Sequence, residues 1–211
     1  MPTEHTVKNG DSITSLAEKY GLFETTIWMH ADNAKLREKR SNKNILAPGD
    51  VVIIPDKTIH QESCAAGSKY KFKRKGVPAK FRVQLFDQSE ARANQSYRFD
   101  IDGKLLEGTT DDDGILVETV SPNAQKGILI IGPDNEKIEF EFGTLQPTDS
   151  TYGAAQRLTN LGFYSGKLDV AEDDDYLIQA IKKFQVKNDL PCTGALDSTS
   201  KEKLTYVHDI K

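Results

Sequence analysis

Hydrophobic residues recur along the chain with two different periods, and the change of period divides the chain into three parts. Before residue 56 and after residue 150 they recur every three to four residues, which is typical of amphipathic helices. Between residues 80 and 145 they alternate with polar residues, which indicates half-buried strands. The pattern predicts a multidomain α+β protein with a small βααβ unit, an antiparallel β-sandwich and a three-helix domain.

The clearest helix of the first part is predicted just after residue 11. Ile13, Leu16 and Tyr20 fall on one helical face. Asp11 is the expected N-cap, because its carboxylate can accept hydrogen bonds from free amides of the first turn. Gly21 lies where a left-handed residue ends a helix.

The remaining elements of the first part are a strand at 5–8, a helix at 25–33 and a strand at 51–54 before a proline. An irregular basic stretch is expected between the second helix and the last strand. A core this small is marginally stable, which favours a short binding module over an enzyme with a deep cleft.

The segment KYKFKRKG at 69–76 allows two interpretations. Basic residues interleaved with aromatic ones are compatible with binding of single-stranded nucleic acid. Alternatively, Tyr70 and Phe72 alternate with lysines on an edge strand, where lysine discourages aggregation. The net charge of −4 and the lack of a second basic patch favour the edge strand.

Two turns are predicted in the middle part. Asp102-Gly103 is a strong signal for a two-residue hairpin. The run Asp111–Asp113 before Gly114 offers three carboxylates, but a calcium loop of the EF-hand type needs ligands spread over about twelve residues. A turn before a strand is the favoured interpretation, and we expect no metal site.

The last part predicts three helices. The first ends at Gly162, and a capping box between Thr199 and Glu202 is expected to start the third. The apolar faces are formed by Ala155, Leu158 and Leu161, by Leu177, Ala180, Ile181 and Phe184, and by Leu204 and Val207. The predicted divisions are 1–56, a connector with a first edge strand at 57–79, 80–146 and 147–211.

Composition limits the possible functions. No apolar run approaches the roughly 18 residues of a membrane span, so we expect a soluble protein that binds neither membranes nor nucleic acid. Cys64 and Cys192 are far apart, which favours two separate thiols over a disulfide. The four histidines show no metal-binding spacing, and no catalytic motif is present. We expect neither a cofactor nor an enzyme.

The first part resembles a LysM domain through HTVKNGDSITSLAEKYG, TIWMHADN and ILAPGDVVIIP. That family binds glycans that contain N-acetylglucosamine, in a shallow groove between the loop entering helix 1 and the loop leaving helix 2. The resemblance implies glycan-binding residues at Gly10, Asp11, Ser12, Ile13, Asn33 and Ala34. The stretch AKLREKRSNKN is longer and more basic than is typical, which suggests extra contacts or a protein partner at Arg37, Lys39 and Arg40.

The last part resembles the helical peptidoglycan-binding domain of wall hydrolases through AAQRLTNLGFYSGKLD and QAIKKFQVKNDLPCTGALDSTSKEKL. The usual glycine-rich connection to helix 2 is replaced by VAEDDDYL. This acidic run is a second candidate surface for a partner, formed by Glu172, Asp173, Asp174 and Asp175.

The middle part is similar to transthyretin-like or immunoglobulin-like spacer domains. The whole arrangement resembles proteins encoded beside the spike genes of type VI secretion systems in Gram-negative bacteria. The resemblance implies a non-catalytic accessory protein that binds peptidoglycan glycan strands. The alternatives are a cytoplasmic adaptor or chaperone scaffold for a secreted effector or the spike, and an immunity protein. With no signal peptide in MPTEHTVKNGD, we expect synthesis in the cytoplasm and delivery to the periplasm by the secretion apparatus.

Overall fold

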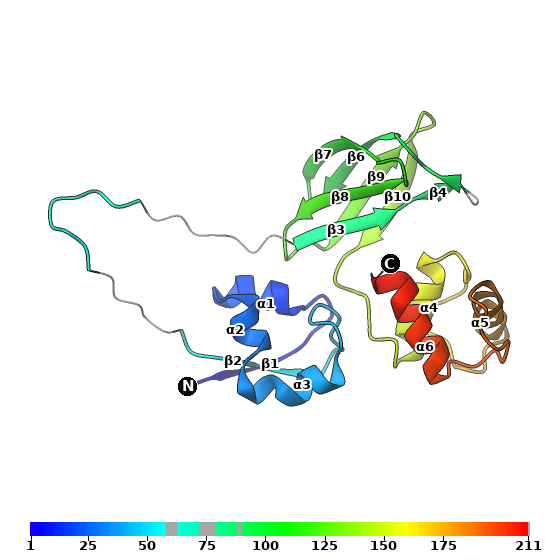
Figure 1. Ribbon diagram of the computed structural model, residues 1–211, viewed down its shortest axis with the longest axis horizontal. Coiled ribbons are helices and arrows are strands. Elements are labelled where there is room, and N and C mark those ends of the chain that lie inside the picture. The colour runs from blue at the N-terminus through cyan, green and yellow to red at the C-terminus, as the bar shows by residue number, and fades with distance from the viewer. Residues whose placement is uncertain (58–62, 72–78, 88–89, 211) are drawn as a thin grey trace. The chain divides into compact units, whose positions relative to one another are not determined.

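The computed structural model describes residues 1–57, 63–71, 79–87 and 90–210, and each of its parts is described by itself. Helices occupy both ends of the chain and strands the middle (Figure 1). The predicted α+β class is confirmed. Within the described ranges, no helix is long and apolar enough to cross a membrane. Tyr70 lies in irregular backbone, whereas Phe72 falls outside the described residues, as does most of the expected first edge strand.

The N-terminal part is a two-stranded antiparallel sheet with short helices between its strands. Strand β1 pairs with β2 in a register that places His5 opposite Val52. The core contains side chains from all these elements, among them Ile13, Leu16 and Ile27, which are fully buried. The elements are β1 (Thr3–Thr6), α1 (Ile13–Tyr20), α2 (Glu24–Trp28), a 3₁₀ turn (Ala31–Asn33), α3 (Ala34–Lys39) and β2 (Val51–Ile54).

Helix α1 is capped by Ser12, so the prediction that Asp11 is the N-cap was wrong. The Ser12 hydroxyl accepts the Ser15 N–H at 3.1 Å, and the Ser15 hydroxyl accepts the Ser12 N–H at 2.9 Å, which forms a capping box. The Asp11 carboxylate is instead bound to the Lys8 N–H at 2.8 Å. The predicted end at Gly21 is confirmed, since this residue has φ 65° in the left-handed region.

The predicted second helix over 25–33 is divided, and the predicted irregular stretch after it is helix α3; both expectations were wrong. His30 has an extended backbone with ψ 139°, which interrupts the helix after Trp28. The Arg37 guanidinium donates to the carbonyl oxygens of Trp28 and, at 2.9 Å, of His30. Arg37 thus satisfies the end of α2 that the interruption exposes, and burial of Leu36 anchors α3.

The middle part consists of antiparallel strands around one core. Four strands form a sheet in the order β10-β9-β6-β7, and β3 pairs with β8. Phe81 of β3 lies 5.5 Å from Phe99 of β6 between ring centroids, so the two sheets share that core. The strands are β3 (Ala79–Gln84), β4 (Phe86–Asp87), β5 (Glu90–Ala91), β6 (Ser96–Ile101), β7 (Lys104–Thr109), β8 (Ile115–Val120), β9 (Lys126–Ile131) and β10 (Glu136–Glu141).

Both predicted turns of the middle part are confirmed. Asp102 and Gly103 have φ 48° and 85° and connect β6 to β7, as a type I′ hairpin turn requires. The Asp111 carboxylate accepts the N–H groups of Asp113 at 3.0 Å and of Ile115 at 2.8 Å, which closes the turn before β8. In the described part of the chain no group of three acidic, histidine or cysteine residues is arranged to hold a metal ion.

The C-terminal part has the three predicted helices, and its core includes Leu158, Leu177, Phe184 and Leu204. The helices are α4 (Thr151–Asn160), α5 (Asp175–Lys187) and α6 (Ser198–Thr205), the last continued by a π-helical turn (Tyr206–Ile210).

The expected Thr199 capping box of α6 was wrong, because α6 begins one residue before Thr199. Asp197 is the N-cap, and its carboxylate accepts the Ser200 N–H at 2.8 Å. Cys64 and Cys192 are both exposed free thiols. The domain boundaries at 56, 79 and 146 stay a prediction.

Candidate functional site

The loop between β1 and α1 is held in one conformation by Asp11. Its Oδ2 atom accepts the Lys8 N–H and lies 2.8 Å from Nε2 of His5. The other ring nitrogen of His5 lies 3.2 Å from the Tyr20 hydroxyl. Gly10 has φ 91°, a conformation that disfavours any side chain. Asp11 and Gly10 therefore shape this loop, and the exposed groups on it are those of Lys8, Asn9 and Gly10.

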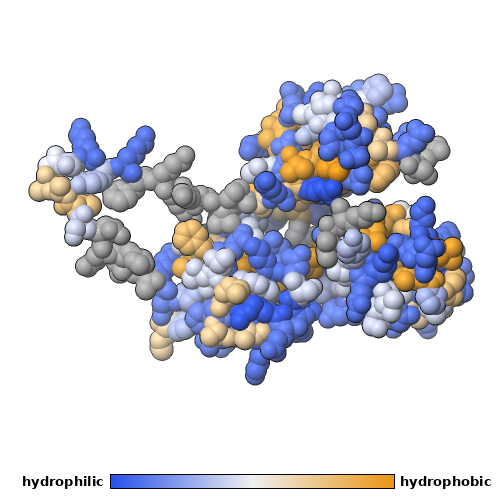
Figure 2. Space-filling view, in the orientation of Figure 1, coloured by the Kyte–Doolittle hydropathy of each residue, from blue (hydrophilic) through white to orange (hydrophobic). Residues whose placement is uncertain are grey.

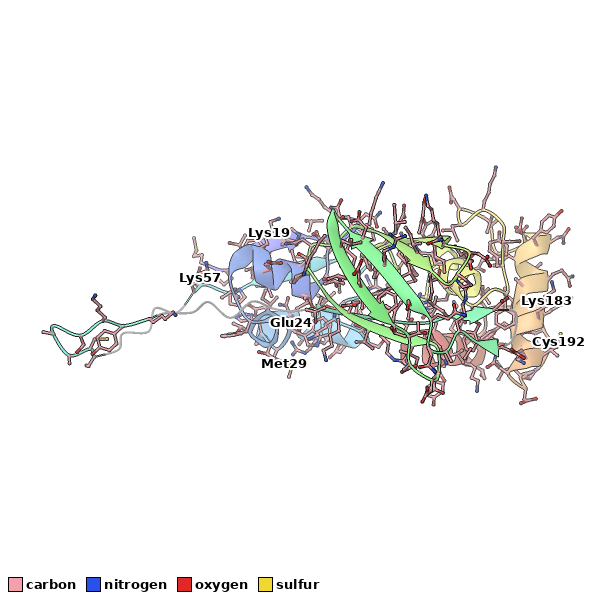
Figure 3. The ribbon with its side chains drawn as sticks, turned by 90° about the horizontal axis from the view of Figure 1, so that it is seen from above. Lys19, Glu24, Met29, Lys57, Lys183 and Cys192 are labelled. Carbon is pink, nitrogen blue, oxygen red and sulfur yellow. The ribbon has the colours of Figure 1, made fainter. Side chains whose placement is uncertain are left out.

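The loop that follows α3 lies directly against the start of α1. The Ile13 N–H donates to the Lys43 carbonyl oxygen at 3.1 Å. The Thr14 hydroxyl lies 2.7 Å from Oε1 of Glu24 and 2.8 Å from Oδ1 of Asn44. Lys43 in turn forms an ion pair with Glu24, which is labelled in Figure 3. The loop that enters α1 and the loop that follows α3 are thus joined by direct hydrogen bonds.

Glu24 is the charged centre of this junction. Burial by itself would raise the pKa of the Glu24 carboxyl, but hydrogen bonds from Lys43 and Thr14 outweigh burial and lower the pKa below its usual value. Glu24 therefore stays ionised at neutral pH and holds Lys43 against α2.

Asn33, which the LysM resemblance assigns to glycan binding, is a structural residue. Its amide group donates to the carbonyl oxygens of Ile27 and Ile53, both at 2.8 Å, and its Oδ1 atom accepts the Ile53 N–H at 2.8 Å. The side chain is 1 % exposed. Ile13 is also buried, whereas Ser12 and Ala34 are half-buried. Of the six expected residues, Gly10 is exposed, and Asp11, Ser12 and Ala34 are partly exposed.

The exposed polar groups of the loop after α3 come from Ser41, Asn42 and Asn44, which were not among the predicted site residues. The Asn44 N–H donates to Oδ1 of Asn42 at 2.9 Å, which fixes this turn. The run SNKN after the basic stretch is a signal for such a turn, because asparagine and serine bond readily to nearby backbone. Amide and hydroxyl groups at this position suit the hydroxyl and acetamido groups of a sugar.

The basic residues predicted to bind a partner are used within their own domain. Arg40 is 5 % exposed, and its Nε and Nη2 atoms lie 2.7 and 3.1 Å from the two carboxylate oxygens of Asp50. Lys39 lies 3.0 Å from the same carboxylate. Arg37 closes the end of α2. These three side chains stabilise the loop that carries Ser41–Asn44.

The acidic run before α5 is partly structural. The Asp174 carboxylate accepts the Leu177 N–H at 2.9 Å and is the N-cap of α5. Asp175 lies in the first turn of α5, where a negative charge is favourable. The Glu172 carboxylate accepts the Thr151 hydroxyl at 3.1 Å, and Asp173 is exposed. The Asp174 cap therefore starts α5 in place of the glycine-rich connection that is usual in this family.

A concave site lies in the C-terminal part, on the exposed side of α5. It is a hollow of about 360 Å³ between the loop 163–166 and one face of α5, which contributes Tyr176, Gln179, Ala180 and Lys183. Lys183 lies on α5 in Figure 3. Tyr176 is 80 % exposed. Sequence reasoning missed this hollow, because its two walls are separated in the chain by the acidic run.

The loop wall of the hollow is fixed by two aromatic rings. Phe163 packs edge-on against Phe184 with ring centroids 5.6 Å apart. The Tyr164 hydroxyl donates to the Lys167 carbonyl oxygen at 2.8 Å. A Cβ atom on Gly166 would lie 2.4 Å from the Tyr164 hydroxyl oxygen, so only glycine permits this packing. The wall is therefore formed before any ligand binds.

Hydrophilic residues cover much of the face seen in Figure 2, with apolar residues in smaller groups. Comparison with protein families identifies a domain in each of two regions of the chain. Residues 5–55 match the LysM domain, and residues 149–204 match the family described as "Putative peptidoglycan binding domain". No curated protein and no solved structure matches the chain.

The chain therefore contains a LysM domain and a peptidoglycan-binding domain, one at each end, and this pair supports a role in binding the bacterial cell wall. Both are binding domains that are typically non-catalytic.

Proposed function

We propose that this protein is a non-catalytic accessory protein that binds peptidoglycan. The observation that carries the proposal is the presence of two wall-binding domains in one chain, at 5–55 and 149–204. Each candidate site presents exposed amide, hydroxyl or aromatic groups of the kind that bind carbohydrate.

In the LysM domain we assign N-acetylglucosamine binding to the rim formed by Lys8–Gly10 on one side and Ser41–Asn44 on the other. The contact between Ile13 and Lys43 at the base keeps this groove shallow. A shallow groove buries little of each sugar, so we expect the isolated site to bind weakly.

Two weak sites on one chain strengthen attachment to a polymer. Once one domain is bound, the second meets its ligand at a high effective concentration, which raises the apparent affinity by about 10² to 10⁴-fold when both engage. This gain requires no further contact and accounts for two wall-binding domains in one protein.

The proposal includes a link to a bacterial type VI secretion system, with delivery from the cytoplasm to the periplasm by that apparatus. Its support is the resemblance of the whole arrangement. The alternative of a cytoplasmic adaptor for an effector or spike protein drew on the basic stretch, but Arg37, Lys39 and Arg40 bind groups of their own domain and supply no argument for it. The immunity-protein alternative has no supporting observation.

The test is sedimentation of the full-length protein with purified sacculi. We expect the protein to pellet with sacculi and to bind chitotetraose through the LysM rim. The double variant Asn42→Ala/Asn44→Ala removes two exposed amides, together with their bonds to the Asn44 N–H and the Thr14 hydroxyl, and should weaken chitotetraose binding while circular dichroism shows it folded. Asp11→Ala and Asn33→Ala are poorer probes, because both residues hold the fold.

The matched control is Lys35→Ala/Glu38→Ala, which changes two exposed residues of α3 in the same domain. It should bind as the unmodified protein does. Folded protein that stays in the supernatant at sacculus concentrations that pellet a known LysM protein would overturn the proposal.

A further inference from the structure

The hollow beside α5 has the properties of a ligand site that is formed in advance. Its volume of about 360 Å³ lies within the range of small-molecule sites. The Tyr164 and Phe163 rings fix the loop wall, and α5 is a regular helix of 13 residues. A ligand that enters this hollow meets a surface that needs no rearrangement.

The helix wall carries a line of three different groups. Tyr176, Gln179 and Lys183 follow one another at the spacing of a single helical face. From Tyr176 to Lys183 the helix rises about 10 Å, at 1.5 Å per residue. An aromatic ring, an amide and an ammonium group therefore lie in sequence over a length that fits a disaccharide or a short peptide.

The lining of the hollow carries positive charge only. Lys183 is the one cation among the lining residues, and none of those residues is acidic. Asp175 does not line the hollow, and Asp174, whose charge is second to burial in raising the pKa of Tyr164, is bound to the Leu177 N–H at the helix start. Lys183 is exposed, and its ammonium group can pair with a ligand that carries the opposite charge.

We propose that this hollow binds a carboxylate-bearing fragment of peptidoglycan, with Lys183 paired to the carboxylate and Tyr176 and Gln179 in contact with the adjoining groups. The inference rests on the proposed wall-binding function. N-acetylglucosamine carries no carboxylate, so the hollow and the LysM rim would recognise different parts of the polymer.

Two parts of peptidoglycan offer the required group. Stem peptides end in a carboxylate, with small methyl groups beside it that suit an aromatic wall. Muramic acid carries a lactyl carboxylate, which is free only where the stem peptide has been removed. Both present the same chemistry to Lys183, and separate probes distinguish them.

The experiment follows backbone amide resonances of the full-length protein during titration with three probes: chitotetraose, a synthetic stem pentapeptide and N-acetylmuramic acid. We expect at least one carboxylate probe to shift the amides of 163–166 and 176–183. Chitotetraose should shift the LysM residues and leave α5 unchanged. A response to the pentapeptide alone assigns the stem peptide, and a response to N-acetylmuramic acid assigns stripped glycan.

Variants make the assignment specific. Lys183→Ala should weaken binding of the responding probe about tenfold, the usual effect of losing one charge-assisted hydrogen bond. Tyr176→Ala should weaken it further, and Lys183→Arg should retain it. Lys187→Ala is the matched control, because it removes an exposed lysine one turn further along α5. These residues are exposed, and unchanged resonances elsewhere confirm that each variant is folded.

The inference is overturned if neither carboxylate probe moves the α5 amides, or if Lys183→Ala binds as tightly as Lys187→Ala. Sacculus sedimentation separates this failure from failure of the proposed function. If the protein pellets with sacculi but binds neither carboxylate probe, the result supports wall binding and excludes the carboxylate site. Protein that binds the probes at α5 but not sacculi would support the site and overturn wall binding.

Discussion

Arg157 and Asp209 form a buried two-pronged ion pair that ties the C-terminal turn to helix α4. The guanidinium Nε and Nη2 atoms lie 3.0 and 2.8 Å from the two carboxylate oxygens, and the side chains are 1 % and 6 % exposed. Arg157 also donates to the carbonyl oxygens of Gln146 and Gly153, at 2.6 and 2.9 Å. One arginine thus joins the segment before α4, the helix itself and the last turn of the chain.

Removal of the carboxylate is expected to destabilise the C-terminal domain strongly. Asp209→Ala leaves a buried guanidinium without its counter-charge, which costs about 3–5 kcal/mol in comparable buried pairs. Urea unfolding followed by circular dichroism measures the loss. Glu202→Ala is the control, because it removes one negative charge from an exposed position of the same domain. Equal unfolding midpoints for the two variants would show that the pair contributes little.

The same pair should make stability depend on acidity. Burial alone would raise the pKa of Asp209, but hydrogen bonds from His208 and Arg157 lower it below its ordinary value of 3.8. A carboxyl with a lowered pKa contributes stability that is present above its ordinary pKa and lost as the pH falls through the lower value. We therefore expect the free energy of unfolding to fall below about pH 4.

Titration of stability from pH 6 to pH 2.5 measures this effect, and the Asp209→Ala variant should show a smaller fall. Glu24, whose pKa is also lowered from its ordinary value of 4.5, should act in the same direction in the LysM domain. An identical pH dependence in the variant and the unmodified protein would exclude Asp209 as the source.

Asn33 and Asn42 are expected to have opposite roles. Asn33→Ala leaves buried backbone groups of Ile27 and Ile53 without a partner, at about 1–3 kcal/mol for each unpaired group. Asn42→Ala removes one exposed hydrogen bond, from the Asn44 N–H, and should cost much less stability than Asn33→Ala. We expect the reverse order for chitotetraose affinity, measured at a temperature where both variants are folded. Reduced affinity of folded Asn33→Ala with unchanged affinity of Asn42→Ala would contradict this assignment.

The two binding domains are expected to act together on intact sacculi. Substitution of either site, Asn42→Ala/Asn44→Ala in one domain or Tyr176→Ala/Lys183→Ala in the other, should lower apparent sacculus affinity by about 10² to 10⁴-fold. A quantitative sedimentation isotherm for each variant measures this. Losses of only about twofold from each would show that the domains bind independently.

Much of the fold was predictable because it follows from periodic apolar residues. Leu158, Leu177 and Phe184 were identified as core residues from helical spacing alone, and Asp102-Gly103 from its turn chemistry. Such signals depend on neighbours within a few residues. The same is true of Gly21 at the end of α1.

The errors arose where a local signal competes with a more distant partner. Asp11 has the chemistry of an N-cap, but His5 and Lys8 hold its carboxylate, and Ser12 takes that role. Asn33 has the chemistry of a ligand-binding residue, but Ile53, twenty positions away, uses its side chain. The α5 hollow requires a specific loop conformation, set by the packing of Gly166 against Tyr164.

The contact between Asn33 and Ile53 also protects the edge of the LysM sheet. Among the described residues strand β2 has one strand partner, β1. The other side of Ile53 would otherwise present a free N–H and carbonyl group to a strand of another molecule. The Asn33 amide fills both positions, as a neighbouring strand would. A module of this size can therefore be fused to unrelated domains, or repeated along a chain, without self-association through its own sheet.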